Sequence, residues 1–192
     1  TTSKTFSISA RAMSDTSVAN VSSQTYTGNS ISPLPTITYN NKTLKKDTDY
    51  TLSYSNNTNA GTATITITGK GNFTGTTSKT FSISARAMSD TSVTNISSQT
   101  YTGNGISPLP TITYNNKTLK KDTDYTLSYS DNINAGTATI TITGKGNFTG
   151  MTSTTFIITQ KSAEKLNISE IANQIYTGKE IKPNVVITDI ER

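Results

Sequence analysis

The sequence contains no cysteine, no histidine and no tryptophan. Because cysteine is absent, the chain has no disulfide framework, no thiolate nucleophile and no cysteine-based zinc site. Because histidine is absent too, it lacks the side chain that most often serves as a general base and a very common transition-metal ligand. Carboxylate chemistry is what remains for an enzyme. We therefore expect a non-enzymatic chain with no catalytic residues, no metal site and no cofactor.

Charged residues are scarce as well, at 15% of the chain, and the net charge is +5. The densest basic runs are Lys45-Lys46 and Lys120-Lys121, and an aspartate follows each of them directly. Nucleic-acid binding needs a contiguous positive face, so we expect no nucleic-acid partner. No apolar run approaches the roughly 20 residues that span a bilayer, and the sequence shows no signal peptide or sorting signal. We expect no membrane insertion within this segment.

Threonine, serine and asparagine are the abundant residues, with 40, 24 and 18 copies. The apolar fraction of 31% is low enough to raise disorder as an alternative. The apolar residues are not evenly diluted, however, because they alternate with Thr and Ser in regular strand patterns. The composition therefore favours a folded all-β chain with a threonine-rich surface.

The main feature of the chain is an internal repeat. Residues 3–77 and 78–152 align without gaps at a spacing of 75 residues, and six positions differ. The differing pairs are Ala19/Thr94, Val21/Ile96, Ser30/Gly105, Asn56/Asp131, Thr58/Ile133 and Thr76/Met151. A third, strongly diverged copy runs from Ser153 to Arg192 and retains, among other matches, Tyr176-Thr177-Gly178. Repeats of this kind indicate modules that stack along a chain.

Each copy predicts six or seven short strands. Apolar residues alternate with Thr or Ser over 6–9, 36–39, 50–55 and 62–68, and clusters of Gly, Asn, Asp and Pro separate these runs. This pattern is typical of small sandwiches made of two antiparallel sheets. The predicted fold class is all-β, with tandem small antiparallel β-sandwich modules arranged end to end. The predicted core residues of the first copy are Tyr26, Ile37, Leu52, Ile65, Ile67, Phe81 and Ile83, with the same set 75 residues later.

The sequence Ala-Arg-Ala-Met-Ser, at 10–14 and 85–89, suggests the module borders. Residues 1–12 then form the closing strand of a preceding module. Residues 13–87 are the first repeat, 88–162 the second, and 163–192 the opening part of a third. The connector after Phe81-Ser82-Ile83-Ser84 contains neither Pro nor a Gly-Ser run, so its composition is not that of a flexible linker.

Several strings within the repeat have a familiar order. They are Tyr-Thr-Gly, Ile-x-Pro, Asp-Tyr-Thr-Leu-Ser-Tyr-Ser-Asn-Asn, and Ala-Gly-Thr-Ala-Thr-Ile-Thr-Ile-Thr-Gly-Lys-Gly-Asn-Phe-Thr-Gly, closing on Thr-Phe-Ser-Ile. In this order they resemble bacterial immunoglobulin-like tandem repeats of surface proteins and adhesins, and are similar to the modules named for a Tyr-Asp-Gly signature. The resemblance implies an Ig-like fold, an extracellular location at the cell surface, either attached to the cell wall or secreted, and a spacer or adhesive role. It carries no catalytic residues to transfer.

Residues that could carry chemistry have simpler interpretations. Asp47 and Asp49 lie two apart beside lysines, which favours turn capping over a glycosidase pair; calcium binding with oxygens from 56–59 stays open as the weaker alternative. The threonines at 62–68 predict a solvent-facing strand face rather than an ice-binding surface. The loop 69–75 lacks the Lys-Ser/Thr ending of a phosphate loop, so we expect a turn that needs positive φ.

Two further possibilities concern tyrosines and cross-links. Tyr39, Tyr50 and Tyr54 are in phase with Ile37 and Leu52, which predicts the core face rather than a sugar-stacking surface. Surface stalks sometimes form Lys–Asn cross-links beside a buried carboxylate. No glutamate occurs in either full copy, so we expect no such bond.

The leading functional hypothesis is a structural stalk or spacer segment of a bacterial cell-surface adhesin, projecting a binding domain from the cell wall. The partners of each repeat are then the neighbouring repeats of the same chain. The alternative is that the repeats themselves are adhesive modules that bind host surface protein or glycan through loops such as 56–59. A third, weaker possibility is an accessory module of a secreted polysaccharide-degrading enzyme.

Overall fold

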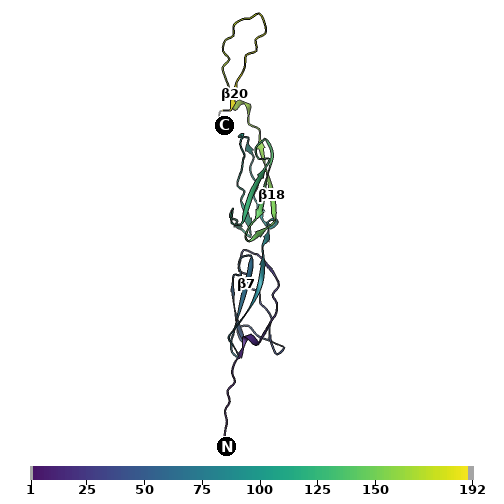
Figure 1. The fold of residues 1–192 in the computed structure, drawn as a ribbon, viewed down its shortest axis with the longest axis vertical. Helices are drawn as coiled ribbons and strands as arrows, with labels where there is room; N and C mark the ends of the chain where they lie inside the picture. Colours follow the sequence, from purple (N-terminus) through teal and green to yellow (C-terminus); the bar gives the residue numbers. More distant parts are fainter. Residues whose placement is uncertain (1, 190–192) are drawn as a thin grey trace. The chain divides into compact units, whose positions relative to one another are not determined.

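A computed structural model describes residues 2–189. The fold is all-β and contains two repeated units, β1–β9 and β10–β18, each built from curled, mixed half-barrel sheets (Figure 1). By its contacts the chain divides into two compact units. The first takes in residues up to 91 together with 113–126 and 143–151, and the second takes in 92–112, 127–142 and the described residues from 152 on. The first compact unit thus includes one end of the second repeat.

The first repeat forms three small sheets. The strands are β1 (Arg11–Ala12), β2 (Ser17–Val18), β3 (Gln24–Thr25), β4 (Ile37–Tyr39), β5 (Lys42–Thr43), β6 (Tyr50–Ser55), β7 (Gly61–Gly69), β8 (Phe73–Thr74) and β9 (Thr76–Ser84), with a 3-10 turn η1 (Met13–Asp15) after β1. The sheet orders are β3-β9-β7-β6, β2-β4-β5 and β1-β8. Pairing of β1 with β8 joins Arg11 and Ala12 to this repeat. The domain boundary expected at residue 12 stays a prediction.

The second repeat has the same elements in the same order. They are β10 (Arg86–Ala87), η2 (Met88–Asp90), β11 (Ser92–Val93), β12 (Gln99–Thr100), β13 (Ile112–Tyr114), β14 (Lys117–Thr118), β15 (Tyr125–Ser130), β16 (Gly136–Gly144), β17 (Phe148–Thr149) and β18 (Met151–Thr159). The sheet orders β12-β18-β16-β15, β11-β13-β14 and β10-β17 match those of the first repeat. The 75-residue sequence repeat is therefore also a structural repeat.

The diverged third copy keeps one pairing. After the 3-10 turn η3 (Ala163–Lys165), strand β19 (Leu166–Ile168) pairs with β20 (Ile187–Asp189), and Ile168 lies opposite Ile187. In the first repeat Val18 lies opposite Ile37, which is the same register shifted by 150 residues. The third copy therefore begins the same fold.

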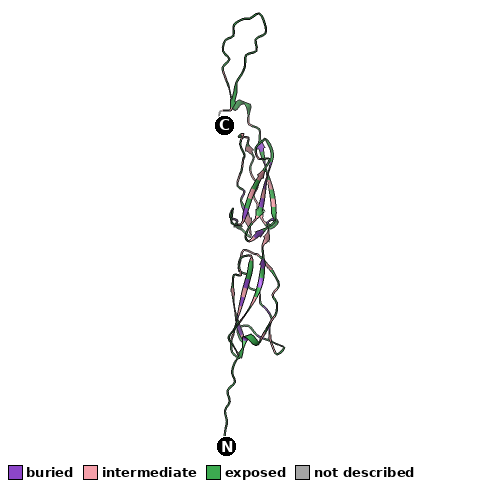
Figure 2. Ribbon diagram, viewed as in Figure 1, coloured by how far each residue is buried: buried purple, intermediate pink, exposed green. Residues whose placement is uncertain are grey.

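Alternating apolar residues build the core. Along β7 the side chains of Ala63, Ile65 and Ile67 are buried while the threonines between them are partly exposed, and Figure 2 shows buried and exposed residues alternating along the strands of each repeat. Five of the seven predicted core residues are buried, and Tyr26 and Leu52 are half-buried against the same cluster. Tyr50, which was predicted to face the core, is buried too, and the other buried residues of the cluster are Met13, Leu44 and Ala63.

The sheets are mixed, so the expectation of purely antiparallel sheets is wrong at two pairs in each repeat. The pairs β3–β9 and β10–β17 are parallel, as are β1–β8 and β12–β18. Parallel neighbours require a long crossover, and β3 and β9 are separated by the whole of β4–β8. Period-2 alternation identifies which face of a strand is buried but carries no information about the direction of its partner.

The residues 2–10 form no strand in this structure. They repeat the sequence of β9, yet Phe6 and Ile8 are 85% and 87% exposed, whereas the matching Phe81 and Ile83 are 4% and 3% exposed. An alternating apolar face of this kind is normally covered by a sheet. The segment 2–10 thus has the sequence of β9 but forms no strand, and its apolar side chains are exposed in this structure.

Candidate functional site

A hairpin tip positions the first part of the candidate site. β13 and β14 pair with Tyr114 opposite Lys117, and the two residues between them, Asn115 and Asn116, have φ of 46° and 60°. Two-residue hairpins favour turns with positive φ at both central positions, and asparagine tolerates this conformation better than most residues. The hairpin therefore presents Tyr114, Asn115 and Lys117 together at its tip.

Strand pairing adds the second part. β10 pairs in parallel with β17, with Arg86 opposite Phe148, and the backbone N–H of Arg86 donates to the carbonyl oxygen of Asn147 at 2.9 Å. The Arg86 guanidinium lies 5.4 Å from the ring centroid of Tyr114, within cation–π range. Phe148 meets the same ring edge-on, at a centroid distance of 5.6 Å. We name the surface formed by Arg86, Tyr114, Asn115, Lys117, Asn147 and Phe148 the docking face of the second repeat.

A loop of the first repeat covers this docking face, and all of these residues belong to the first compact unit. The loop is Tyr26-Thr27-Gly28-Asn29, which we name the Tyr-Thr-Gly loop. The Tyr26 ring stacks on Tyr114 at 6.4 Å and meets Phe148 edge-on at 5.5 Å. These are favoured geometries for aromatic pairs. The contact leaves Phe148 only 3% exposed, whereas its equivalent Phe73 is half-buried.

Hydrogen bonds to backbone carbonyls hold the Tyr-Thr-Gly loop in place. Arg86 Nε donates to the Tyr26 carbonyl oxygen at 3.2 Å. Asn115 Nδ2 donates to the Thr27 carbonyl oxygen at 3.0 Å, and Lys117 Nζ donates to that of Gly28 at 2.7 Å. Gly28 has a φ of 79°, which favours glycine at this turn. The docking face therefore binds the backbone of the loop as well as the Tyr26 ring.

Asn147 recognises a second loop of the first repeat. Its Oδ1 accepts the backbone N–H of Ala60 at 2.8 Å, and its Nδ2 donates to Asn59 Oδ1 at 3.1 Å. The side-chain amide thereby uses both its acceptor and a donor.

Burial, together with the charge of Asp124, raises the pKa of the Tyr26 phenol, so the phenol is neutral at ordinary pH. The site therefore holds the two loops of the first repeat through both ring contacts and hydrogen bonds.

The third copy has a different face at the corresponding place. Lys161 stands where the other copies have Arg11 and Arg86, and Asp189 stands where they have Tyr39 and Tyr114. Lys161 Nζ forms an ion pair with Asp189, and both line a depression beside Tyr101, all within the second compact unit. A cation over an aromatic ring in two copies is thus replaced by a cation–carboxylate pair in the third.

Asp47 and Asp49 are turn residues, as expected. Asp47 has a φ of 66°, and Asp49 Oδ2 accepts the backbone N–H of Lys45 at 2.8 Å. The carbonyl oxygen of Asp47 accepts a hydrogen bond from Lys70 Nζ at 2.7 Å. Within residues 2–189 no cluster of three or more acidic side chains is placed to hold a metal ion.

The other sequence candidates also take structural positions. Gly71 and Gly75, in the loop 69–75, have positive φ, which confirms the turn. Among the tyrosines, Tyr50 is buried, and Tyr39 and Tyr54 are half-buried against the core. Burial raises the pKa of Tyr54, whose hydroxyl donates to the Pro33 carbonyl oxygen at 2.8 Å. Tyr50 and Tyr54 thus pack in the core, as predicted, whereas Tyr39 packs against the core and also borders an open depression.

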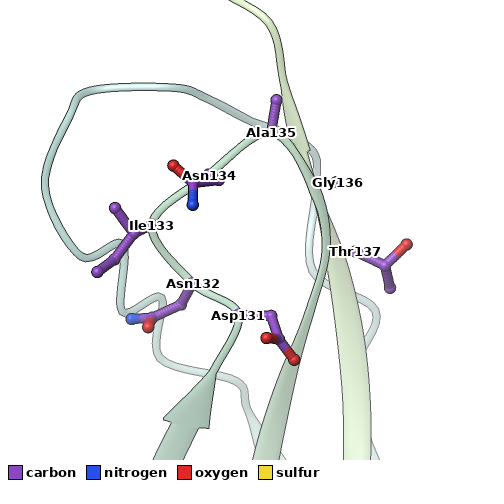
Figure 3. A pocket seen from close by; sticks show the side chains of 7 residues that line it. All are labelled: Asp131, Asn132, Ile133, Asn134, Ala135, Gly136 and Thr137. Carbon is purple, nitrogen blue, oxygen red and sulfur yellow. The ribbon is translucent and has the colours of Figure 1, made fainter.

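The loops between the two long strands form shallow depressions. Residues 131–137 line one of about 390 Å³, and the equivalent 56–62 line one of about 410 Å³. Figure 3 shows the first, with the side chains of Ile133 and Thr137 directed to opposite sides of the loop. In the first repeat Ser30 and Thr58 hydroxyls are 3.3 Å apart, and in the second these positions are Gly105 and Ile133. Three of the six differences between the repeats therefore lie at this loop.

No helix in the described chain is long and apolar enough to cross a bilayer. No protein-family model matches the chain, and no curated protein matches it.

The docking face was not among the sequence candidates. Its residues come from three separate segments, at 86, 114–117 and 147–148, and none of these segments alone indicates the surface that they form together. The available signal was the paired change in the third copy, where Arg becomes Lys161 and Tyr becomes Asp189 together.

Proposed function

We propose that this chain is a structural stalk or spacer segment of a bacterial cell-surface adhesin. Ig-like repeats joined end to end would carry a binding domain away from the cell wall. The observation that carries the proposal is the contact between the docking face and the Tyr-Thr-Gly loop. It joins consecutive repeats through side chains that both full copies possess.

A length-setting repeat needs little else. Each added copy extends the chain and requires no new chemistry, provided that it can be joined to its neighbours. Near-identity of residues 3–77 and 78–152 fits this requirement. No polar or charged residue is buried in the described cores, so the repeats carry no internal polar site that would point to a bound ligand.

A second candidate function is adhesion by the repeats themselves, with host surface protein or glycan as the ligand. The observation in its favour is the clustering of sequence differences at the loop 131–137, where Ile133 is 50% exposed. Variation concentrated at one exposed loop is what a binding surface would show.

Binding assays separate the two functions. The 192-residue chain would be applied to glycan arrays and to immobilised extracellular-matrix proteins over a concentration series. For a spacer we expect no saturable binding. Saturable binding that the substitution Ile133→Thr abolishes would overturn the spacer proposal and support adhesion through the 131–137 loop, because threonine is the residue of the first repeat at that position.

A further inference from the structure

The first repeat carries a second copy of the docking face. Its residues are Arg11, Tyr39, Asn40, Lys42, Asn72 and Phe73, identical in type to the six residues of the docking face in the second repeat. In the described part of the chain, no loop covers these residues in the way that the Tyr-Thr-Gly loop covers the docking face of the second repeat. Arg11 and Asn72 are exposed where Arg86 and Asn147 are half-buried.

This open face already has the geometry of the occupied one. The Arg11 guanidinium lies 5.4 Å from the Tyr39 ring centroid, the same separation as between Arg86 and Tyr114. The Tyr39 and Phe73 rings meet edge-on at 5.7 Å, against 5.6 Å in the second repeat. Tyr39, Lys42 and Phe73 line an open depression of about 380 Å³. Because the side chains of the face already have this arrangement, binding of an occupant costs little side-chain entropy on the side of the face.

We propose that this open face is a docking site for the Tyr-Thr-Gly loop and the Asn59-Ala60 loop of another copy of this repeat, joined ahead of it in the same chain. The proposal rests on the spacer function and extends it. The docking face of the second repeat shows which groups these six residues bind. Its two aromatic rings contact one tyrosine ring of the occupant, and its arginine, lysine and asparagine side chains donate hydrogen bonds to three backbone carbonyl oxygens of the occupant.

The segment 2–10 supports the same occupant. It repeats the closing strand β9 and leads directly into Arg11, as β9 leads into Arg86. Its exposed Phe6 and Ile8 correspond to side chains that a complete repeat buries. A copy that used 2–10 as its own closing strand would place its Tyr-Thr-Gly loop beside the open face, because Tyr26 lies where β3 pairs with the end of β9. A contact of few residues suffices when its partner is covalently linked, since the effective concentration is high.

A fluorescent reporter tests the proposal. The chain has no tryptophan, so Phe73→Trp introduces a single probe into the open face. It would be compared in the 192-residue chain and in an extended chain in which one further copy of residues 13–87 is inserted between Ala12 and Met13. We expect acrylamide quenching to fall several-fold in the extended chain. Phe148→Trp is the matched control, because its site is covered in both chains, and its quenching should be low and unchanged.

Two further variants make the result specific. Tyr26→Ala in the inserted copy alone should restore quenching of the Phe73→Trp probe. Lys42→Ala, an exposed change that leaves folding intact, should not alter the thermal midpoint of the 192-residue chain but should lower that of the extended chain. Quenching that is equal in both chains, or a Lys42→Ala effect that is absent from the extended chain, would overturn the proposal. That failure is distinct from failure of the spacer function, which would appear as saturable binding of an external ligand.

Discussion

Single side chains decide whether each repeat packs, and Ile65 is the clearest case. It is fully buried at the centre of β7, which lies between β9 and β6 in the four-stranded sheet of the first repeat. A carboxylate there would be buried without a partner, which costs far more than loss of apolar area alone. Each repeat is small, so a single such change exceeds what its core can tolerate.

We therefore expect Ile65→Asp to destabilise the first repeat by about 4 kcal/mol or more. Thr66→Asp is the matched control, because Thr66 is the next residue of β7 and faces the opposite, partly exposed side. Circular dichroism during thermal unfolding measures both. A melting curve for Ile65→Asp that coincides with that of the parent would show that the assigned strand face is wrong.

Gly69 ends β7 at a place where no side chain fits. A Cβ atom there would lie 2.7 Å from the backbone of Phe73 and Thr74, and 2.9 Å from Met13 Cγ. Because two of these neighbours are backbone atoms, they cannot move aside cheaply. We expect Gly69→Ala to lower the free energy of unfolding by about 1–3 kcal/mol, measured by urea denaturation. Gly105→Ser is the control and should leave the free energy of unfolding unchanged, because the first repeat has Ser30 at that position. Equal effects of the two substitutions would contradict the packing at Gly69.

Two half-buried tyrosines, Tyr54 and Tyr129, predict a dependence of stability on alkaline pH. Burial raises the folded-state pKa of Tyr54 and of Tyr129 above the value of about 10 expected in the unfolded chain. Below that pH both states are neutral and the stability is complete. As the pH rises further, the unfolded state ionises first, so stability falls until the folded-state pKa is passed.

Thermal midpoints measured between pH 8 and pH 11 test this dependence. We expect a fall above about pH 10, which Tyr54→Phe should make shallower. Tyr54→Phe should also lower the midpoint at neutral pH, because it removes the hydrogen bond to Pro33. Tyr176→Phe is the control at an exposed ring and should leave the profile unchanged. A profile for Tyr54→Phe as steep as that of the parent would be the contrary result.

At the scale of strands and loops, the sequence predicts faces better than partners. The alternation along 50–55 and 62–68 correctly places Ile65 and Ile67 in the core, because period 2 is local information. The parallel pairing of β3 with β9 depends on a crossover of many residues and leaves no local pattern. Met13 was missed for a similar reason, since it lies in a short 3-10 turn rather than in an alternating run.

The docking face could not be predicted from the sequence because it combines three segments that come together only in the fold. Lys117 and Asn147 are 30 residues apart and contact different loops of the first repeat. What the sequence did indicate was that the connector is not a flexible linker, and that Tyr-Thr-Gly is retained even in the diverged copy. Neither observation names the surface that the loop contacts.

The two repeats offer a built-in comparison for this contact. Lys117 and Asn147 make hydrogen bonds to the first repeat, whereas the equivalent Lys42 and Asn72 are exposed on the open face. We expect Lys117→Ala and Asn147→Ala each to lower the stability of the chain by about 1 kcal/mol. Lys42→Ala and Asn72→Ala should have no measurable effect. Thermal unfolding followed by calorimetry measures all four, and equal effects at both positions would show that the docking contact adds nothing.

At the scale of the whole chain, the spacer function predicts that each repeat adds a fixed length. A strand of about seven residues at roughly 3.3 Å per residue, with its end loops, suggests a module on the order of 30 to 40 Å. Repeats that are joined end to end through a docking face should add this increment each time. Repeats that fold back on one another, or that are linked loosely, should not.

Small-angle X-ray scattering of chains with two, three and four copies of residues 13–87 measures this increment most directly. For a spacer we expect the maximum dimension to rise by an equal step, of about 30 to 40 Å, with each added copy. Lys117→Ala combined with Asn147→Ala should broaden the distance distribution without changing the fold of either repeat. A maximum dimension that stays nearly constant as copies are added, with the compact distance distribution of a globular particle, would contradict the spacer function.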